Sequence, residues 1–294
     1  MMLKLIHLIV GKYKLFCQKE KSRLNIEVAV KDIYRHTFKQ ELNLEQPKTI
    51  NEKLQYLKLY DYYNNELITT CVDKVKVKEY IKSLDIGVKC AKTIGVYEKS
   101  SEIDWKQLPK KMVIKCNHGS GYNIICEDKE NINIHKVCKQ LDTWMKEDFW
   151  TLFAEPQYKN IKKRILIEEY LSGAEYTYKF YCFNGKAKII YISSNGENGE
   201  KDKYVDYFDL NWVWQDITLE GHEHMRGKID KPLLLEEMIG KAELLAKNFK
   251  FVRVDLYCHS EEIYLSEYTF IPTGGYMKLH PPKVAEEWGN WLKI

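Results

Sequence analysis

The segment from Phe251 to Tyr276 constrains the fold more than any other part of the chain. It reads FVRVDLYCHSEEIYLSEYTFIPTGGY: two β-prone runs on either side of a short polar turn, followed by a Pro-Thr-Gly-Gly loop. Alternation along a strand places Arg253 and Asp255 on one face, and a hairpin brings Glu267 opposite them. Two carboxylates and a guanidinium are costly to bury together without a partner. The segment therefore predicts a hairpin that carries a group of converging charges.

This group of charges suits a particular kind of ligand. Carboxylate oxygens are hard ligands of the kind that Mg²⁺ uses when it carries substrate phosphates, which indicates a nucleotide-using enzyme. An exposed ladder of salt bridges, worth little free energy, is the alternative. The apolar neighbours of Asp255, which include Val254 and Leu256, argue against full exposure.

The rest of the chain mixes helical and strand-like segments. At 294 residues it has the length of about two domains. Residues 25–85 are predicted to be mostly helical, with Asn51 as the N-cap of one helix. Beyond this region, runs rich in Val, Ile and Tyr predict strands, and further helices are predicted over 134–149 and 232–249. The alternation indicates an α/β or α+β protein.

A glycine-containing turn follows the apolar run from Met112 to Ile114 and reads KCNHGSGYN. Gly119 and Gly121 allow backbone NH groups to approach a phosphate closely, and Lys115 supplies a positive charge. The turn is not a Walker A loop, because it lacks the GK[ST] ending and a second strand follows it. A simple hairpin turn is the alternative. His118 lies within the turn, where it could touch phosphate or substrate.

A second polar turn follows the apolar run from Ile165 to Ile167 and reads EEYLSGAE. Backbone groups of such a hinge could contact a flat base while Glu175 meets ribose hydroxyls. An ordinary turn at Ser172 and Gly173, with exposed glutamates, is the alternative.

Composition bears on partners and compartment. The net charge of +4 comes from basic residues that are spread among acidic ones, so no nucleic-acid partner is indicated. None of the 8 cysteines forms a C-x-x-C pair, and we expect reduced thiols and a cytoplasmic protein. His222 and His224 have H-x-H spacing without an evident third ligand, which favours a solvated loop over a metal site.

The N-terminal segment, MMLKLIHLIVGKYKLF, has an apolar run too short to span a bilayer. It also lacks a clear cleavage site for a secretory signal. Residues 3–16 alternate apolar and basic residues and could lie on the inner face of an anionic membrane. The alternative, which we favour, is a helix packed on the body of the protein.

Taken in order, these segments resemble the ATP-grasp superfamily: a Lys strand with a glycine loop, then E-E-Y-L-S-G-x-E, then R-x-D and E-x-T. The hinge and the 253–275 segment are similar to those of the D-alanine–D-alanine ligase type. Segments that extend over about residues 45–282 resemble the TupA-like branch more narrowly. They are PKTINEKLQYLKLYD (47–61), VDKVKVKEYI (72–81), IKCNHGSGYNII (114–125) and VRVDLY…EYTFIPTGGY (252–276). That branch is associated with teichuronopeptide and other surface-polysaccharide biosynthesis.

The resemblance implies an ATP-grasp fold of the α/β (α+β) class, in which two lobes clasp ATP. Residues 1–88 would form an N-terminal, mostly helical region and residues 89–166 a small lid lobe. Residues 167–294 would form a C-terminal lobe with the metal site.

The resemblance also implies a nucleotide site. The expected ATP-phosphate contacts are Lys74 and Lys115, and the expected mobile loop over the phosphates is Gly119, Ser120 and Gly121. The expected lining of the adenine site is Glu168, Glu169 and, through its backbone, Leu171, with Glu175 at the ribose.

The implied metal site adds the residues of the hairpin. Asp255 and Glu267 would hold Mg²⁺, and Arg253, with Lys115, would act on the phosphate in flight. Thr269 stands where many superfamily members have Asn. Its hydroxyl would ligate the second metal or hold its water, with altered affinity.

The activity that the resemblance implies is an ADP-forming ligation of a carboxylate to an amine through an acyl phosphate. It would serve capsule or cell-wall polysaccharide biosynthesis and join an amino acid to a uronic-acid sugar or related acceptor, alongside polysaccharide-assembly proteins. The acceptor is expected near the Thr273-Gly274-Gly275 loop and the 196–230 region, where His224 and Arg226 lie.

Three alternatives to the ligase stay open. One is a kinase that phosphorylates a sugar hydroxyl with the same phosphate machinery. Another is a glycosyltransferase, although no clear D-x-D site is present. The third is a nonenzymatic nucleotide-binding scaffold.

Overall fold

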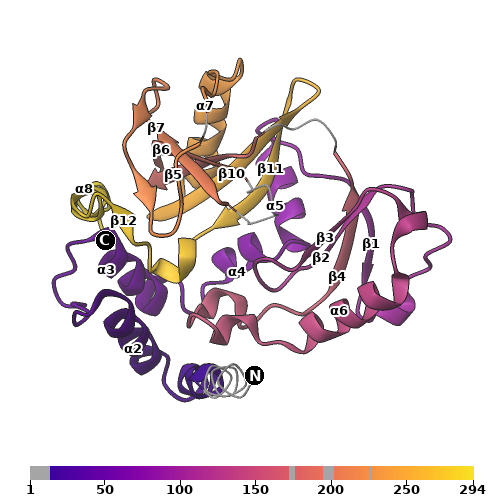
Figure 1. The fold of residues 1–294 in the computed structure, drawn as a ribbon, viewed down its shortest axis with the longest axis horizontal. Helices are drawn as coiled ribbons and strands as arrows, with labels where there is room; N and C mark the ends of the chain where they lie inside the picture. The colour runs from indigo at the N-terminus through magenta and orange to yellow at the C-terminus, as the bar shows by residue number, and fades with distance from the viewer. Residues whose placement is uncertain (1–13, 172–175, 195–201, 226) are drawn as a thin grey trace, which may run out of the picture.

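The computed structural model describes residues 14–171, 176–194, 202–225 and 227–294. The described residues form two larger antiparallel sheets and a small two-stranded one, β12 (Leu279–His280) with β9 (Thr218–Leu219), with helices around them (Figure 1). A cleft lies between the two larger sheets. Residues 14–24 are helical. The further helical elements described are α2 (Ile26–Phe38), α3 (Ile50–Tyr56), η1 (Leu57–Asp61), α4 (Glu66–Val72), α5 (Lys76–Leu84), η2 (Ser100–Glu102), η3 (Lys129–Asn131), α6 (Ile134–Lys146), η4 (Phe149–Thr151), η5 (Pro156–Tyr158), α7 (Leu235–Ala246), η6 (Pro272–Gly275) and α8 (Lys283–Trp291). The strands described are β1 (Thr93–Tyr97), β2 (Met112–Cys116), β3 (Asn123–Cys126), β4 (Ile165–Glu169), β5 (Tyr178–Phe183), β6 (Lys186–Ser194), β7 (Tyr204–Phe208), β8 (Trp214–Gln215), β9 (Thr218–Leu219), β10 (Phe251–His259), β11 (Glu262–Thr269) and β12 (Leu279–His280).

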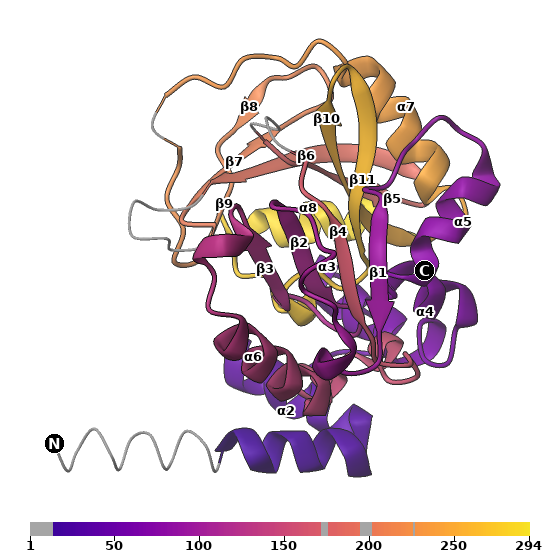
Figure 2. The same ribbon diagram turned by 90° about the vertical axis from the view of Figure 1, so that its right-hand side faces the viewer.

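Of the two larger sheets, the smaller has the strand order β1-β4-β2-β3, and its neighbouring strands are antiparallel. Along β2, Met112, Ile114 and Cys116 are buried, whereas Val113 and Lys115 are half-buried. Because side chains alternate along a strand, the buried set faces α6, which lies along one face of this sheet (Figure 2). Lys115 therefore points to the opposite face, toward the cleft.

The larger sheet has the order β11-β10-β5-β6-β7-β8, again antiparallel. Neighbouring residues of β5 show that both of its faces are covered. Cys182 Sγ lies 3.9 Å from the Ala242 carbonyl oxygen of α7, while the ring of Tyr181 lies 5.0 Å from that of Trp288 in α8. The strand is accordingly aromatic or apolar on both faces except at Lys179.

The N-terminal helices are joined to the C-terminal part of the chain by buried polar contacts. Asn51, predicted to be an N-cap, instead lies buried in the first turn of α3. Its side chain donates to the Met277 carbonyl (2.9 Å) and accepts from the Met277 NH (2.8 Å). Thr49 caps the helix in a capping box with Glu52. The N-cap prediction is wrong because a distant backbone partner occupies the Asn51 side chain.

The remaining expectations for the helices hold approximately. The helix predicted over 134–149 ends earlier, at Lys146, and the one predicted over 232–249 begins at Leu235, after Pro232. The predicted class, α/β or α+β, is confirmed, and the antiparallel sheets give it its α+β character. The lobe boundaries at 88/89 and 166/167 stay predictions.

Over the described residues, no helix has both the length and the apolar character needed to cross a membrane. All eight cysteines are free thiols. The segment expected either on a membrane or on the body of the protein lies largely outside the described residues, which begin at residue 14. The predictions of membrane contact and of a cytoplasmic location therefore stay predictions.

Candidate active site

The hairpin of β10 and β11 has the register that its sequence predicts. Asp255 is paired with Glu267, and Arg253 with Thr269. The connecting residues Ser260 and Glu261 both have positive φ, 50° and 62°, as a tight two-residue hairpin turn requires. Directly opposite residues of an antiparallel pair share a face. The hairpin thus places two carboxylates, a guanidinium and a hydroxyl on one surface.

Arg253 and Asp255 form a buried, bidentate pair. Arg253 Nε donates to Asp255 Oδ1 and Nη2 to Oδ2, both at 2.7 Å, and Nη2 also donates to Thr269 Oγ1 at 3.0 Å. The Asp255 side chain is 5% exposed. Burial raises the pKa of Asp255, while the Arg253 guanidinium acts in the opposite direction. The pair holds the guanidinium in one orientation beside Glu267.

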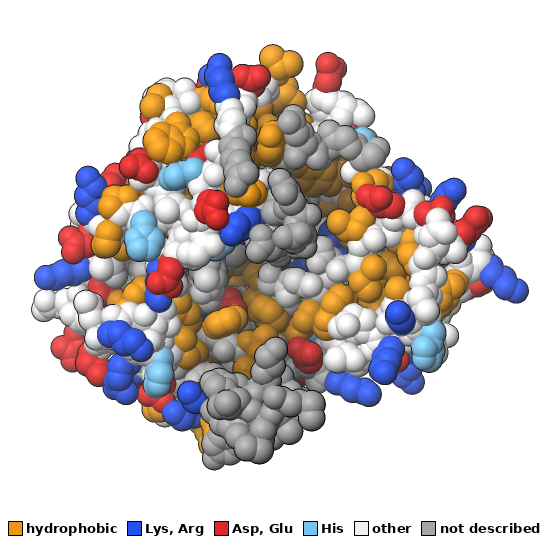
Figure 3. Space-filling view, in the orientation of Figure 1, with side chains coloured by type: hydrophobic (Ala, Val, Ile, Leu, Met, Phe, Trp, Pro, Cys, Tyr) orange, Lys and Arg blue, Asp and Glu red, His pale blue; other side chains and the backbone are white. Residues whose placement is uncertain are grey.

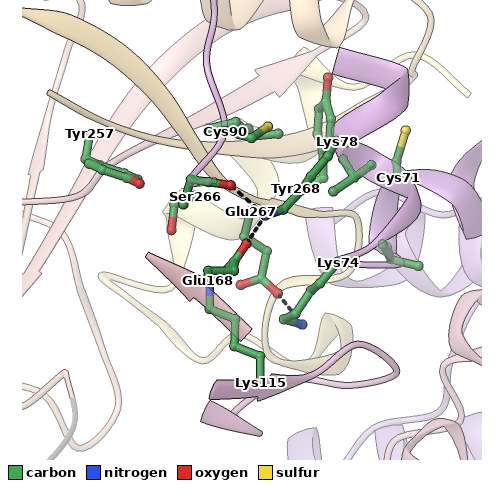
Figure 4. Close-up of a pocket in the computed structure, with 14 residues that line it drawn as sticks. Cys71, Lys74, Lys78, Cys90, Lys115, Glu168, Tyr257, Ser266, Glu267 and Tyr268 are labelled. Carbon is green, nitrogen blue, oxygen red and sulfur yellow. Dashed lines mark hydrogen bonds and ion pairs between the residues drawn. The ribbon is translucent and has the colours of Figure 1, made fainter. Parts of the chain in front are cut away.

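A pocket opens beside Glu267, between the two sheets (Figure 4). It combines three lysines and two glutamates with apolar and aromatic walls. Its lining residues are Cys71, Val72, Lys74, Val77, Lys78, Cys90, Ala91, Lys115, Glu168, Tyr257, Leu265, Ser266, Glu267 and Tyr268. Figure 3 shows the surface hollowed between the two sheets, with hydrophobic side chains in the hollow. Such a pocket suits a ligand that is flat and apolar at one end and anionic at the other.

Glu168 is the buried centre of the positive charges in this pocket. Its carboxylate lies 2.5 Å from Lys115 Nζ and also forms an ion pair with Lys78. Burial opposes ionisation of Glu168, but Lys115 and Lys78 outweigh it and hold the pKa of this carboxyl below its ordinary value. The lysines in turn are held in the pocket, where they can face a ligand.

Lys74 connects the pocket to the hairpin and to the glycine loop. Its Nζ donates to the Gly119 carbonyl at 2.5 Å and lies 3.4 Å from Glu267 Oε1. The turn that carries Lys74 is held by Asp73, whose Oδ1 accepts from the Val75 NH (2.9 Å) and from Asn117 Nδ2 (2.8 Å). Burial disfavours the charge on Glu267, yet nearby cations, Lys74 first among them, keep its pKa lowered.

The glycine loop between β2 and β3 is shaped by close packing. A Cβ atom on Gly119 would lie 2.6 Å from the Phe149 ring, and Gly121 has φ +75° with open space around it. Ser120 is exposed. His118 points away from the pocket: its Nε2 lies 3.1 Å from the Trp144 carbonyl of α6, and burial lowers its pKa to about 4. His118 therefore anchors the loop to α6, and the expectation that it touches phosphate is not supported.

The structure separates some of the hinge residues that the resemblance groups together. Glu168 faces the pocket, but Glu169 lies on the other side of β4, where its Oε1 accepts from the Lys92 NH at 2.6 Å. Leu171 is the second residue after the end of β4. Glu175 lies outside the described residues, as does Arg226.

Sequence analysis missed two lysines that the structure brings to the site. Lys78 lies in the first turn of α5, shortly after the turn that carries Lys74, and it pairs with Glu168. Lys179 interrupts the aromatic run YTYKFYCF and is paired in register with Asp255. The sequence feature that could have identified Lys179 is that it is the one charged residue in an otherwise largely aromatic and apolar run.

The residues of the hairpin fit a magnesium ion. Asp255 and Glu267 are directly opposite each other and offer carboxylate oxygens, and each Asp255 oxygen keeps lone pairs beyond those used by Arg253. Within the described residues, no group of three or more His, Cys, Asp and Glu could hold a metal by itself. Such a pair suits a Mg²⁺ ion that takes its remaining ligands from phosphates and water.

The paired sheets, the lysine-lined pocket and the carboxylate hairpin define the class: the fold is that of the ATP-grasp ligases. The family profile described as TupA-like ATPgrasp matches residues 52–293, and the chain belongs to that family. No curated protein matches the chain.

Solved structures of ligases are similar to the chain at low sequence identity. The L-amino acid ligase from Bacillus licheniformis is 13% identical, with 86% of this chain and 57% of that chain covered and a TM-score of 0.50. The D-alanine–D-alanine ligase from Helicobacter pylori is 18% identical, with 83% and 69% covered and a TM-score of 0.46. The D-alanine–D-alanine ligase from Bacillus anthracis, complexed with ATP, is 19% identical, with 69% and 54% covered and a TM-score of 0.40. The chain thus spans between about half and seven-tenths of the length of these structures.

Proposed function

We propose that the protein is an ATP- and Mg²⁺-dependent carboxylate–amine ligase. One observation carries the proposal: a pocket with three lysines around a buried glutamate ends at a carboxylate pair that is held beside a buried arginine. A nucleotide triphosphate is strongly anionic, and a divalent ion bridges its phosphates to protein carboxylates. Membership of the TupA-like ATPgrasp family supports the same assignment.

The roles that the resemblance implies are proposed for these side chains as follows, and the positions of the described residues are compatible with them. Lys74 and Lys115 bind the ATP phosphates, with Gly119, Ser120 and Gly121 above them. The base lies toward β4, near Glu168 and the backbone of Glu169 and Leu171. For Glu175, which lies outside the described residues, the ribose contact rests on the sequence resemblance alone. Asp255 and Glu267 hold Mg²⁺, and Thr269 completes this group through its hydroxyl, which also accepts from Arg253.

The chemistry follows from these positions. Bound ATP supplies a γ-phosphoryl group, which passes to the substrate carboxylate and leaves ADP and an acyl phosphate. The amine nitrogen then attacks the acyl carbon, the C–O bond to phosphate breaks, and loss of a proton gives the amide. Arg253 and Lys115 stabilise the charge on the transferred group, so that catalysis is mainly positioning and charge neutralisation.

The finer assignment concerns the substrates. We infer that the enzyme joins an amino acid to a uronic-acid sugar in surface-polysaccharide biosynthesis, in the cytoplasm. The support for this is the resemblance of four segments to the TupA-like branch, which is associated with surface-polysaccharide biosynthesis. We expect the acceptor to enter near the Thr273-Gly274-Gly275 loop and the 196–230 region, part of which lies outside the described residues.

The first test is nucleotide binding. Mg·ATP at about a hundred times its Kd should stabilise the wild type by roughly 2.7 kcal/mol, a melting-temperature shift of several degrees. Glu267→Gln removes one of the two metal carboxylates, so we expect a smaller Mg²⁺-dependent shift. No shift in the wild type with nucleotide in excess would contradict the proposal.

The products test the reaction class. The purified enzyme with Mg·ATP, D-glucuronate and L-glutamate, and then with related acids and amines, should release ADP and phosphate and yield an amide. Phosphate retained on the sugar would instead identify a kinase.

A further inference from the structure

A row of side chains on the larger sheet continues past the proposed metal pair. The strand register pairs Glu267 with Asp255, Asp255 with Lys179, and Lys179 with Tyr191. Opposite residues in antiparallel strands share a face, so these side chains form one line across four strands. Glu267 lines the pocket. Lys179 therefore lies on the far side of Asp255 as seen from that pocket.

Lys179 is a largely buried cation. Its side chain is 13% exposed, and its Nζ donates to Ser193 Oγ at 2.7 Å and lies 3.5 Å from Asp202 Oδ1. The same nitrogen lies 4.6 Å from the centroid of the Tyr191 ring. An ammonium group has three donors, so Lys179 can keep its contact with Ser193 while it binds an anion.

Of the two buried cations on this face, Lys179 is paired less tightly with a carboxylate than Arg253 is. Arg253, on the same face, is a second buried cation, and its guanidinium is already engaged at both oxygens of Asp255. Two like charges in a buried site are unfavourable unless anions compensate them. The contact from Lys179 to Asp202 is longer than the contacts between Arg253 and Asp255. Lys179 is thus better placed than Arg253 to turn toward a ligand.

We propose that Lys179 binds an anionic oxygen of the substrates on the side of the metal pair opposite the nucleotide. The oxygen belongs either to the phosphoryl group in transfer or to the carboxylate that receives it. The inference rests on the proposed function, in which these two anions must approach each other. A cation beside the carboxylate that accepts the phosphoryl group offsets the repulsion between these two anions. Lys179 would then belong to the acceptor half of the site.

The test compares the full-length wild type with Lys179→Met, Lys179→Arg and a matched control, Lys186→Met. Lys186 lies on the neighbouring strand β6, with its side chain 69% exposed and paired to Glu243 at 2.6 Å. Calorimetry first gives the Kd of Mg·ADP for each protein. One arm then titrates orthovanadate, a phosphoryl mimic, into the Mg·ADP complex. The other titrates D-glucuronate and L-glutamate into the complex with Mg²⁺ and a nonhydrolysable ATP analogue.

We expect all four proteins to bind Mg·ADP alike, which also shows that the variants fold. In Lys179→Met the Kd of orthovanadate rises roughly tenfold if the oxygen is on the phosphoryl group, because a hydrogen bond to a charged group contributes about that factor. If the oxygen is on the carboxylate, the Kd of the carboxylate rises instead. Lys179→Arg should keep part of the wild-type affinity for the affected anion, and Lys186→Met should keep all of it.

Two results would overturn the inference while leaving the proposed function in place. One is equal affinity of the wild type and Lys179→Met for vanadate and for both carboxylates. The other is that the wild type binds Mg·ADP but none of these anions. Failure of the wild type to bind Mg·ADP would contradict the proposed function, and this inference with it.

Discussion

At the scale of single residues, Glu168 decides the charge of the pocket. It is 4% exposed and forms ion pairs with Lys78 and Lys115. Removing one partner of a buried ion pair leaves the opposite charge uncompensated, which costs about 3–5 kcal/mol. The carboxylate is therefore expected to stabilise the fold as well as to shape the nucleotide site.

We predict that Glu168→Gln lowers the free energy of unfolding by about 3 kcal/mol at pH 7. Because the folded pKa of Glu168 is lowered, its contribution is present above the unfolded pKa of about 4.3 and is lost as the pH falls through the folded value. The difference between wild type and variant should shrink accordingly in acid. Urea unfolding at several pH values measures it.

The matched control for this variant is Glu287→Gln, at an exposed position of α8. It should leave stability nearly unchanged. A Glu168→Gln variant as stable as this control at pH 7 would show that the buried ion pairs are not stabilising.

At the scale of elements, the glycine loop depends on its contact with η4. Gly119 packs so closely on Phe149 that a methyl group would lie 2.6 Å from the ring. His118 and Tyr122 add contacts to α6, through the Trp144 carbonyl at 3.1 Å and Glu147 Oε2 at 2.7 Å. The base of the loop is thus anchored, while Ser120 at its tip is exposed.

We predict that Gly119→Ala destabilises the protein by about 1–3 kcal/mol through overpacking. Ser120→Ala, at the exposed neighbouring position, should change stability by less than about 0.5 kcal/mol. If the clash with Phe149 is the cause, the effects of Gly119→Ala and Phe149→Leu should not add, because the smaller side chain relieves the contact. Chemical denaturation of the single and double variants measures this coupling, and strict additivity would exclude the contact as the cause.

At the scale of the whole molecule, the start of α3 is packed against the C-terminal helix α8. A Cβ atom on Gly289 of α8 would lie 1.9 Å from the Lys48 carbonyl oxygen, next to the start of α3. Lys53 Nζ also donates to the carbonyls of Gly289 (2.9 Å) and Leu292 (2.6 Å). This interface holds the N-terminal helices against the larger sheet, whose Tyr181 packs on Trp288.

We predict that Gly289→Ala lowers stability by about 3 kcal/mol, or the melting temperature by roughly 5–10 °C, because the clashing atom belongs to the backbone and cannot rotate away. Gly240→Ala in α7 is the matched control, since nothing lies within 4 Å of its added Cβ. That variant should gain about 0.5–1 kcal/mol from helix propensity. Thermal unfolding of both proteins distinguishes a specific clash from a general effect of alanine.

Local patterns predicted much of the candidate site. The period of two along β10 and β11 placed Arg253, Asp255, Glu267 and Thr269 on one face, and the register confirms this. The turn at Gly119 and Gly121 also lies between two strands, as expected. These features depend on neighbours close in sequence, so the residue pattern carries them.

The contacts made across the cleft were not predictable in the same way. The pairing of Lys78 with Glu168, and the capture of Asn51 by the Met277 backbone, join residues far apart in the chain. No local period encodes them, because they depend on how the sheets and helices pack.

By itself, the sequence determined the hairpin, the order of the motifs and the family to which the chain belongs. The tertiary structure decided which charges meet: Glu168 with two lysines, His118 with α6, and Lys179 in line with Asp255 and Glu267. The physical reason is the range of the interactions. Strand alternation and turn geometry follow from adjacent residues, whereas a buried charge is stable only where folding supplies its partners.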